Sequence, residues 1–567
     1  MTLLHGSSYT AGGVARFPIL VPGCSMTGAL SFLTLPVASP RRTRSRGDCR
    51  PARRVWLACT FALLSSACMI GPDFKRPPVE VATDWMDAGS GTIDSGRAQY
   101  RDWWSSLDDP VLSKLIDLAY ERNLSLLSAG VRVLEARAQL GVAIGEIYPQ
   151  QQQLSATASY NRIPVSVPYA PIDNTFWQLT LGAQVGWELD LWGKVRRGIE
   201  SASSAFLASV AAYDDVLVTL TGDVASAYVR IRTIDVQLDI ARENILRQQK
   251  ALAIARARFA GGVVTRRDVY QAENVLGATE ATIPQLTIER RKATNALSVL
   301  LGMPPAPLDD LLAGTSGIPV APASLVVGIP ADLLRRRPDV RKAELHAAAQ
   351  SAQIGLAKGA LFPSFSLIGS IGRLSSDVGQ SSLGSGSVGY SAGPAIQWSI
   401  LNYGQITNNV RVQDAKLQGL LVDYRNVVLK AQQEVENGIT EFSQSRVEAA
   451  LLQTSVVAAT GAFQIALLQY KEGTADFNVV LNAEENLYKA QNSLAVAQGN
   501  IPLGLIKAYR ALGGGWALRD GRDFVPLATR EEMAARTDWG APELLRPQAP
   551  GLPGPEDVGP LFRPPEW

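Results

Sequence analysis

Histidine and cysteine are scarce in this chain of 567 residues, which contains two histidines and four cysteines. All four cysteines lie within residues 1–68, and His346 is the only histidine after His5. Zinc sites and cysteine- or histidine-dependent active sites need several such side chains close together. We therefore expect no metal site, no cofactor and no enzymatic activity in the chain that follows Cys68.

The chain also lacks a strong net charge, because 54 lysines and arginines face 52 aspartates and glutamates. This balance argues against a charge-driven disordered protein and gives no basic excess that would indicate nucleic-acid binding. The charges are nevertheless unevenly placed. Residues 1–67 hold eight arginines and one aspartate, a net charge of +7, whereas residues 68–567 hold 46 basic and 51 acidic groups, a net charge of −5. The basic excess belongs to the N-terminal segment alone.

The apolar run at residues 55–64 is too short to span a bilayer, which takes about 20 residues. A cluster of arginines precedes it, and Ser65, Ser66, Ala67 and Cys68 follow. This order is typical of a secretory signal segment, here residues 1–67. A small-residue stretch that ends in cysteine also resembles a bacterial lipobox, which implies cleavage before Cys68 and lipid attachment to it. An ordinary signal peptide is the alternative. We expect translation to start downstream of residues 1–40.

An internal repeat organises the rest of the chain. Residues 139–149 align with 353–363 at an offset of 214, and 187–193 with 398–404 at an offset of 211. Residues 259–276 align with 470–487, again at 211. Three ordered matches predict two similar halves, 105–305 and 325–516, joined by a linker at 306–324, since solenoid repeats are much shorter. Residues 68–104 are predicted to be a lipid anchor and linker, and the proline-rich tail, 517–567, to be mostly disordered.

Each half is predicted to contain one strand pair after a helical stretch. The helical stretches are 110–146 and 330–360, and the strands are 153–160, 176–189, 365–372 and 388–400. From Trp177 to Trp187, apolar and polar residues alternate, which indicates a strand with one apolar and one polar face. Such strands suit a transmembrane barrel or a soluble sheet. Four strands are too few to close a barrel, so closure would need several chains, and three would give twelve strands.

Very long helices are predicted to follow the strands. No proline occurs between Pro171 and Pro284, and apolar residues recur there every seven positions, which favours coiled-coil packing. A single helix over 193–260 would be about 100 Å long, and its charges exclude burial in a bilayer. Gly262 and Gly473 are expected to end these helices. One further helix is then expected to return in each half, ending near Leu301 and Gly513.

The motifs resemble those of a known family. The sequence Cys68-Met-Ile-Gly-Pro-Asp-Phe-Lys-Arg-Pro77 is similar to the family's mature start. Residues 102–112 (DWWSSLDDPVL), 328–340 (GIPADLLRRRPDV) and 511–516 (ALGGGW) resemble further blocks of it. The family is that of the outer-membrane factors of tripartite efflux systems, TolC-like and of the lipoprotein NodT type.

This resemblance implies an α+β fold in a homotrimer. Four transmembrane strands per chain would complete a twelve-strand barrel, and long coiled-coil helices would form a periplasmic tunnel. The implied function is a passive exit duct in the outer membrane for small molecules such as drugs, toxic compounds or metals. An inner-membrane transporter would drive export through a periplasmic adaptor protein. The implied partners are these two proteins and outer-membrane lipid, with no nucleic acid.

The resemblance also implies where the tunnel narrows and where the adaptor binds. Asp476 and Asn482 are the aperture candidates, and Asp476 has a second interpretation as a helix cap. The helix-tip candidates for adaptor contact are Gly262, Gly473, Thr474, Ala475 and Phe477. Two rival functions stay open from the residues alone: a lipid-anchored trimeric coiled-coil adhesin, and an enzyme on a helical scaffold. The strand pairs disfavour the first, and the scarcity of histidine and cysteine disfavours the second.

Overall fold

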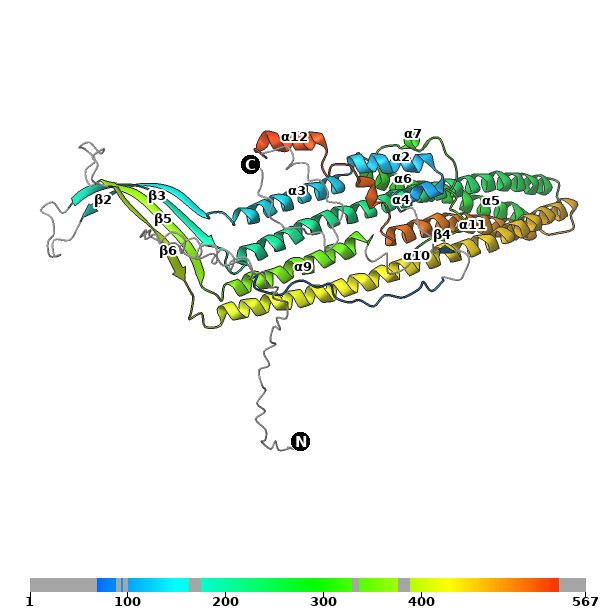
Figure 1. Ribbon diagram of the computed structural model, residues 1–567. Helices are drawn as coiled ribbons and strands as arrows, with labels where there is room; N and C mark the ends of the chain where they lie inside the picture. The colour runs from blue at the N-terminus through cyan, green and yellow to red at the C-terminus, as the bar shows by residue number, and fades with distance from the viewer. Residues whose placement is uncertain are drawn as a thin grey trace, which may run out of the picture. The chain divides into compact units, whose positions relative to one another are not determined.

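The computed structural model describes residues 69–87, 93–94, 100–162, 175–328, 336–375 and 388–539 (Figure 1). The predicted signal segment, the predicted lipidation site Cys68 and the end of the tail, 540–567, lie outside these residues. All described residues belong to one compact unit of the chain, 65–567.

The four predicted strands form one antiparallel sheet. They are β2 (Gln151–Arg162), β3 (Thr175–Leu189), β5 (Ser364–Ser375) and β6 (Val388–Gln397), hydrogen-bonded in the order β2-β3-β5-β6. Each half of the chain contributes one hairpin, and the β3–β5 pair joins the halves. β2 and β6 are the edge strands, and each is paired on one side only within the sheet.

The sheet has the two different faces that the alternation predicts. On the apolar face, Tyr160 of β2 pairs with Trp177 of β3, and their ring centroids are 5.3 Å apart. On the polar face, the amide of Gln184 donates to Gln153 Oε1 at 2.6 Å, in the register that the strand pairing sets. Polar side chains therefore satisfy one another on one face, while the other face presents apolar groups.

Two helices of nearly equal length follow the hairpins. α4 (Lys194–Ala260) has 67 residues and α10 (Gln405–Glu472) has 68, and their first residues are 211 positions apart, the repeat offset. The single helix predicted over 193–260 is confirmed. The seven-residue series of α4 faces the interior, because Leu217, Val224 and Ile231 are fully buried.

Shorter helices lie beside the long ones. They are α2 (Pro110–Arg122), α3 (Leu124–Gly145) and α9 (Pro338–Gly359). α3 packs on α4, α4 on α9 and α9 on α10, so that the helices next to the sheet follow the same order as the strands (Figure 1). The predicted stretch 110–146 is divided at Asn123, whose side chain accepts from Leu126 N at 2.9 Å and starts α3.

The return path differs between the two halves. In the second half one helix, α11 (Phe477–Ala511), returns as predicted and continues through Pro502. In the first half the prediction of one helix is wrong, because α5 (Arg266–Glu280) and α6 (Thr282–Leu300) are separated at Ala281. Pro284 has no N–H for the carbonyl of Glu280, which weakens the helix there.

The remaining short elements surround the middle of the long helices. They are β1 (Ile93–Asp94), η1 (Trp103–Leu107), α7 (Asp309–Leu312), β4 (Leu325–Val326), η2 (Trp516–Arg519) and α12 (Leu527–Arg536). β1 pairs with β4 in parallel, and the main hydrophobic core lies in this region, with Trp103 stacked on Tyr509 at 5.6 Å.

The prediction that the tail is disordered is wrong for residues 517–539. Phe524, Val525 and Met533 are buried in the main core, and Arg519 forms a buried ion pair with Asp214 of α4. Eight of the nine prolines after Trp516 lie beyond residue 540. Averaging the composition over the whole tail therefore concealed a structured first half.

Candidate functional site: helix tips and the strand–helix junction

The helix tips are the two turns that end α4 and α10. Gly262 has φ +69° and Gly473 has φ +79°, the left-handed conformation that glycine adopts without strain. Thr474 closes the second turn, because its backbone N–H and its hydroxyl both donate to the carbonyl of Gln469, at 2.9 and 3.1 Å. The two predicted glycine stops are thus equivalent turns, 211 residues apart.

One arginine joins the two tips. The guanidinium of Arg258, on the last turn of α4, lies 4.6 Å from the centroid of the Tyr470 ring on α10 and donates to the Tyr470 carbonyl. Tyr470 in turn contacts Phe477, with ring centroids 4.9 Å apart. Together with Leu252 and Val480, these rings belong to a second hydrophobic cluster, separate from the main core. The tips therefore form one packed body within the protomer.

The predicted adaptor-contact residues divide into exposed and buried ones. Gly262, Gly473 and Thr474 are exposed, and Ala475 is half-buried. Phe477 is only 2% exposed, because its ring packs under Tyr470. Phe477 therefore supports the shape of the tip from inside and presents almost no surface to a partner.

The two aperture candidates are both exposed at the start of α11. Asp476 occupies the N-cap position, with an extended backbone, but its carboxylate accepts no hydrogen bond from the N–H groups of the first turn. The capping contact in this turn comes from the backbone, since Val479 N donates to the Asp476 carbonyl at 3.1 Å. Asn482 lies on the exposed side of the same helix. The Asp476 side chain is thus directed to solvent.

The strand–helix junction is the second feature with a possible functional role. Trp187, which ends β3, donates from Nε1 to the carbonyl of Ile147 at 2.9 Å, and Trp398 donates to the carbonyl of Leu361 at 3.0 Å. The two tryptophans are equivalent in the repeat, and so are the two carbonyls. Each hairpin is therefore fastened to the preceding helix by the same hydrogen bond.

The described chain begins at this junction. Ile70 N donates to the Trp192 carbonyl at 3.1 Å, next to the start of α4. Gly71, with φ +113°, passes so close to α9 that a Cβ on it would lie 2.4 Å from the Gly355 Cα. The N-terminal residues are thus fixed where β3 ends and α4 begins.

Arg197 holds this segment in place. Its buried guanidinium donates to the carbonyls of Ile70 and Gly71, at 3.2 and 3.3 Å. It also forms ion pairs with Asp73 at 2.7 Å and Glu200 at 2.6 Å. Sequence reasoning missed this residue, because its partners are distant in the chain and no local pattern distinguishes it.

Sequence reasoning also missed Glu484 of α11. It is 1% exposed, and neither carboxylate oxygen has a hydrogen-bond partner among the described residues. Burial raises the pKa of Glu484 to about 7, and the positive charge of Arg247 opposes this shift. The sequence did contain a signal. Glu484 is three or four residues from Val480, Leu481 and Leu487, and residues at this spacing share one face of a helix, here the buried one.

No group of three or more histidine, cysteine, aspartate or glutamate side chains able to hold a metal ion occurs among the residues that the structure describes. The expectation of no enzymatic activity stays a prediction.

Comparison with known proteins identifies the family. Residues 115–303 and 329–514 match the sequence family described as "Outer membrane efflux protein". The chain is 29% identical to nodulation protein T of Rhizobium leguminosarum bv. trifolii, over 77% of this chain and 92% of that protein. It is 27% identical to the "Probable outer membrane lipoprotein SilC" of Salmonella typhimurium, over 81% and 97%.

A solved structure of the outer-membrane channel OprN superposes with a TM-score of 0.74 at 31% identity, covering 79% of this chain and all of that one. The similarity extends over both repeats, the strand hairpins and the long helices. It confirms the resemblance drawn from the motifs, and the chain belongs to the outer membrane efflux protein family.

Proposed function

We propose that this chain assembles as a homotrimer into the outer-membrane exit duct of a tripartite efflux pump. The duct itself would supply no energy for export. An inner-membrane transporter, joined to the duct by a periplasmic adaptor, would drive small molecules through it. The observation that carries this proposal is that the protomer is open along two matching edges. β2 and α3 form one edge, and β6 and α10 form the other.

The two edges are complementary in direction. In the antiparallel order β2-β3-β5-β6, the first and last strands run in opposite directions. β6 of one copy can therefore pair with β2 of the next as a further antiparallel pair. Four strands cannot close by themselves, whereas three copies would give a twelve-strand barrel without unpaired edges. The pairing would also bring α10 of one copy against α3 of the next.

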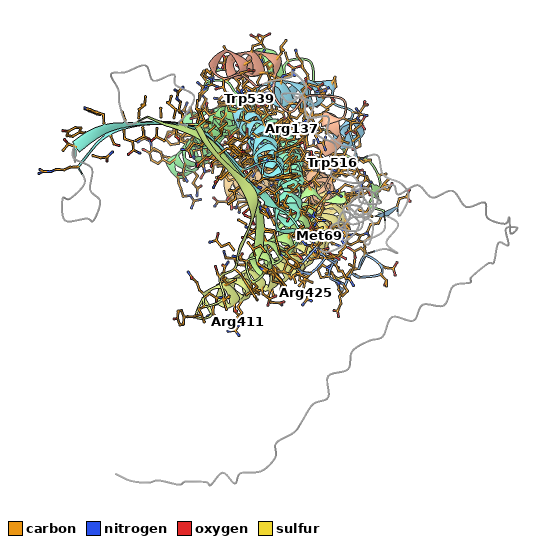
Figure 2. The ribbon with its side chains drawn as sticks, turned by 60° about the vertical axis from the view of Figure 1, so that its left-hand side comes forward. Met69, Arg137, Arg411, Arg425, Trp516 and Trp539 are labelled. Atoms are coloured by element: carbon orange, nitrogen blue, oxygen red, sulfur yellow. The ribbon has the colours of Figure 1, made fainter. Side chains whose placement is uncertain are left out.

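The exposed apolar surface of α10 favours the same assembly. An 18-residue window of α10 has a mean hydropathy of 1.6, but only 11% of it is buried within the protomer. Leu451, Val457 and Ile465 of this helix are more than half exposed. Figure 2 labels Arg411 and Arg425 of α10 at the outer border of the helices. A second copy of the chain is the occupant that would remove this apolar surface from water.

The lengths of the elements fit a membrane-crossing sheet and a periplasmic tunnel. The strands have 12, 15, 12 and 10 residues, and about 9–11 tilted residues cross an outer membrane. The long helices extend about 100 Å from the sheet. The strand–helix junction would then lie at the inner surface of the membrane, with the helix tips at the far end.

This arrangement supports lipidation of Cys68. Cys68 immediately precedes Met69, and Ile70 is hydrogen-bonded at the strand–helix junction. Acyl chains on Cys68 would therefore lie at the height where the membrane is expected to begin, and several chains on one residue would anchor the protein firmly. The relative named as a lipoprotein is similar over 97% of its length, which supports the same interpretation.

The helix tips would face the adaptor. Gly262, Gly473, Thr474 and Ala475 offer surface for this contact, while Phe477 shapes the turn from within. Three copies of Asp476, one from each subunit, would place a ring of carboxylates at the entrance and favour cations. Asn482 would line the same entrance without charge.

Planar-bilayer recording tests this proposal. Purified wild-type protein should form trimers and open channels after addition to one side of the bilayer. The reversal potential under a salt gradient should show cation preference, which the Asp476→Asn variant should reduce and Asn482→Asp should increase. Trimers that never conduct, even under high voltage, would contradict the proposed function as an exit duct. Unchanged selectivity in both variants would overturn only the aperture assignment.

A further inference from the structure

Glu484 is an unpartnered acid in an apolar environment. It lies on α11, between the tip and the middle of the helix, in the part of α11 that packs on α4, α5 and α10. The neighbouring cluster consists of Leu252, Val480, Leu487 and further apolar groups, and both Glu484 oxygens are buried without a donor. An ionised carboxylate in such a place loses its hydration and gains only the partial compensation of the Arg247 charge.

A second buried acceptor, without a donor among the described residues, lies on α4. Gln248 is 3% exposed, and its Oε1 is also buried without a donor. The helices α4 and α11 are antiparallel and linked by Gln237–Asn492 and Asn244–Gln491 hydrogen bonds, each 2.9 Å. The close approach of Gly222 to Arg510 and of Thr233 to Gly499 sets the register, because 11 residues along α4 match 11 along α11. Fifteen residues further toward the tip, this register places Gln248 opposite Glu484. With Oε1 of Gln248 turned toward α11, a proton on the Glu484 carboxyl group would supply the donor that this oxygen lacks.

The charges around Glu484 leave it without a close counter-ion. Arg247 of α4 is the charged group that acts on it, and Arg247 itself pairs with Glu243 at 2.9 Å. On α10 no charged residue lies between Glu448 and Lys471, and Tyr470 is the titratable group of that end. Further charged groups of the surrounding helices are Arg258 of α4, which lies against Tyr470, and Asp268 at the start of α5. Glu273 of α5 pairs with Arg256, and Glu485 of α11 pairs with Lys489.

We propose that Glu484 is a proton-binding site whose neutral carboxyl group donates a hydrogen bond to Gln248 Oε1 and so links α11 to α4 near the helix tip. Loss of the proton breaks this link and leaves a buried charge, which favours separation of the two helices. The consequence for the aperture depends on the proposed function: protonation closes the tip, and deprotonation opens it.

The direction of the pH dependence follows from burial. Because burial raises the pKa of Glu484 from 4.5 to about 7, packing of the tip is strongest while the residue is protonated. The stability of the packed tip falls as pH rises from about 4.5 to about 7, and Glu484 contributes no further change above that. The device therefore responds between about pH 4.5 and about pH 7.

The first experiment measures hydrogen exchange of the α11 backbone between Val480 and Gln491 in the wild-type trimer, from about pH 5 to about pH 9 and corrected for intrinsic exchange. Protection should fall about tenfold as Glu484 ionises. In Glu484→Gln the amide donates to Gln248 permanently, so protection should stay high across this range. The matched control is Glu273→Gln, the repeat-equivalent and surface-paired position, which should titrate like the wild type.

Two further readouts distinguish the outcomes. Difference infrared spectroscopy should show a neutral carboxylic acid C=O band that disappears near pH 7 and is absent from Glu484→Gln. Channel opening in bilayers should rise with pH in the wild type and not in Glu484→Gln. Protection that titrates identically in Glu484→Gln would overturn the proton site. If the protein forms no channel, exchange and infrared spectra still test the proton site, and only the gating consequence fails.

Discussion

The two long helices have the same length and equivalent positions in the repeat, yet their surroundings differ. An apolar 18-residue window of α4 is 56% buried within the protomer, whereas the corresponding apolar window of α10 is only 11% buried. α4 packs against α2, α3, α5, α6, α9 and α11, whereas α10 packs mainly against α9 and α11. One copy of the duplicated unit became the centre of the protomer, and the other remained at its edge.

The same contrast appears where the helices begin. Arg197 in the first repeat is buried under the N-terminal segment, with two ion pairs. Its counterpart in the second repeat is Asn408, which is exposed and bonded to Arg411 at 3.0 Å. Duplication therefore gave two similar frameworks. The N-terminal segment buries the start of α4 and also runs beside α9 and α10, where the Ala82 and Met86 N–H groups donate to Gln432 and Glu436, but Asn408 at the equivalent start of α10 stays exposed.

The largest effect is expected from charges on the exposed face of α10. The double variant Leu451→Asp and Val457→Asp should convert trimers to monomers, because the carboxylates would be buried at the subunit interface. The measurement is mass by light scattering, with circular dichroism to confirm that the helices persist. Leu527→Asp, at an equally exposed position on α12, is the control and should remain trimeric. A trimeric double variant would contradict the role of this face.

The next effect concerns the asymmetry at the helix starts. Arg197→Ala removes the donor to the Ile70 and Gly71 carbonyls and the partner of Asp73. It should weaken docking of residues 69–87 by about 1.5–3 kcal/mol, because the exposed Asp73 carboxylate can be hydrated again. Limited proteolysis should cut this segment much faster than in the wild type. Asn408→Ala is the matched change in the second repeat and should leave proteolysis unchanged. Equal sensitivity of both variants would show that the N-terminal segment is held by other contacts.

A smaller effect should follow from alanine at the two tips. Gly262→Ala and Gly473→Ala each force a side chain into the left-handed region, at a cost of about 1–2 kcal/mol. The two costs should be similar, because a Cβ at Gly473 would make only an ordinary contact with Arg258 Nη2, at 3.5 Å, and one at Gly262 would have no described neighbour within 4 Å. Thermal unfolding of the two variants measures both costs, and a large difference between them would contradict this prediction.

The smallest effect is expected at the junction. Trp187→Phe and Trp398→Phe each remove one hydrogen bond to a carbonyl, worth about 0.5–1.5 kcal/mol. Trp187→Phe should cost more, because Trp398 is 55% exposed and water can replace its bond. Chemical denaturation followed in detergent tests this order. An identical loss of unfolding free energy in the two variants would mean that the exposure of the tryptophan does not affect the strength of its hydrogen bond.

Much of the fold could be predicted because its signals are local. The alternation from Trp177 to Trp187, the seven-residue series of α4 and the glycine stops at 262 and 473 each reflect geometry within one element. The break at Ala281 was missed because a single proline, Pro284, interrupts an otherwise continuous helical pattern. The tail helix Leu527–Arg536 was missed because the proline content was averaged over the whole tail.

The candidate site was less predictable, because its decisive features are contacts between distant segments. The apolar spacing of α11 contained a signal, not used in the sequence analysis, that Glu484 falls on the buried side of the helix. That no described donor reaches it depends on the side chains of the packed neighbouring helices. In the same way, Asp476 could be placed at a helix start, while only the structure shows that its carboxylate does not bond to the helix N–H groups.

The sequence by itself determined the duplication, the two strand hairpins, the long helices with their glycine turns and the family, because each is set by periodicity, backbone preference or a contiguous motif. Only the tertiary structure decided which repeat is central, that Arg197 holds the N-terminal segment at the strand–helix junction, and that the buried oxygens of Glu484 and Gln248 have no donor among the described residues. These depend on the register between packed elements, which small shifts would change and which no local pattern encodes.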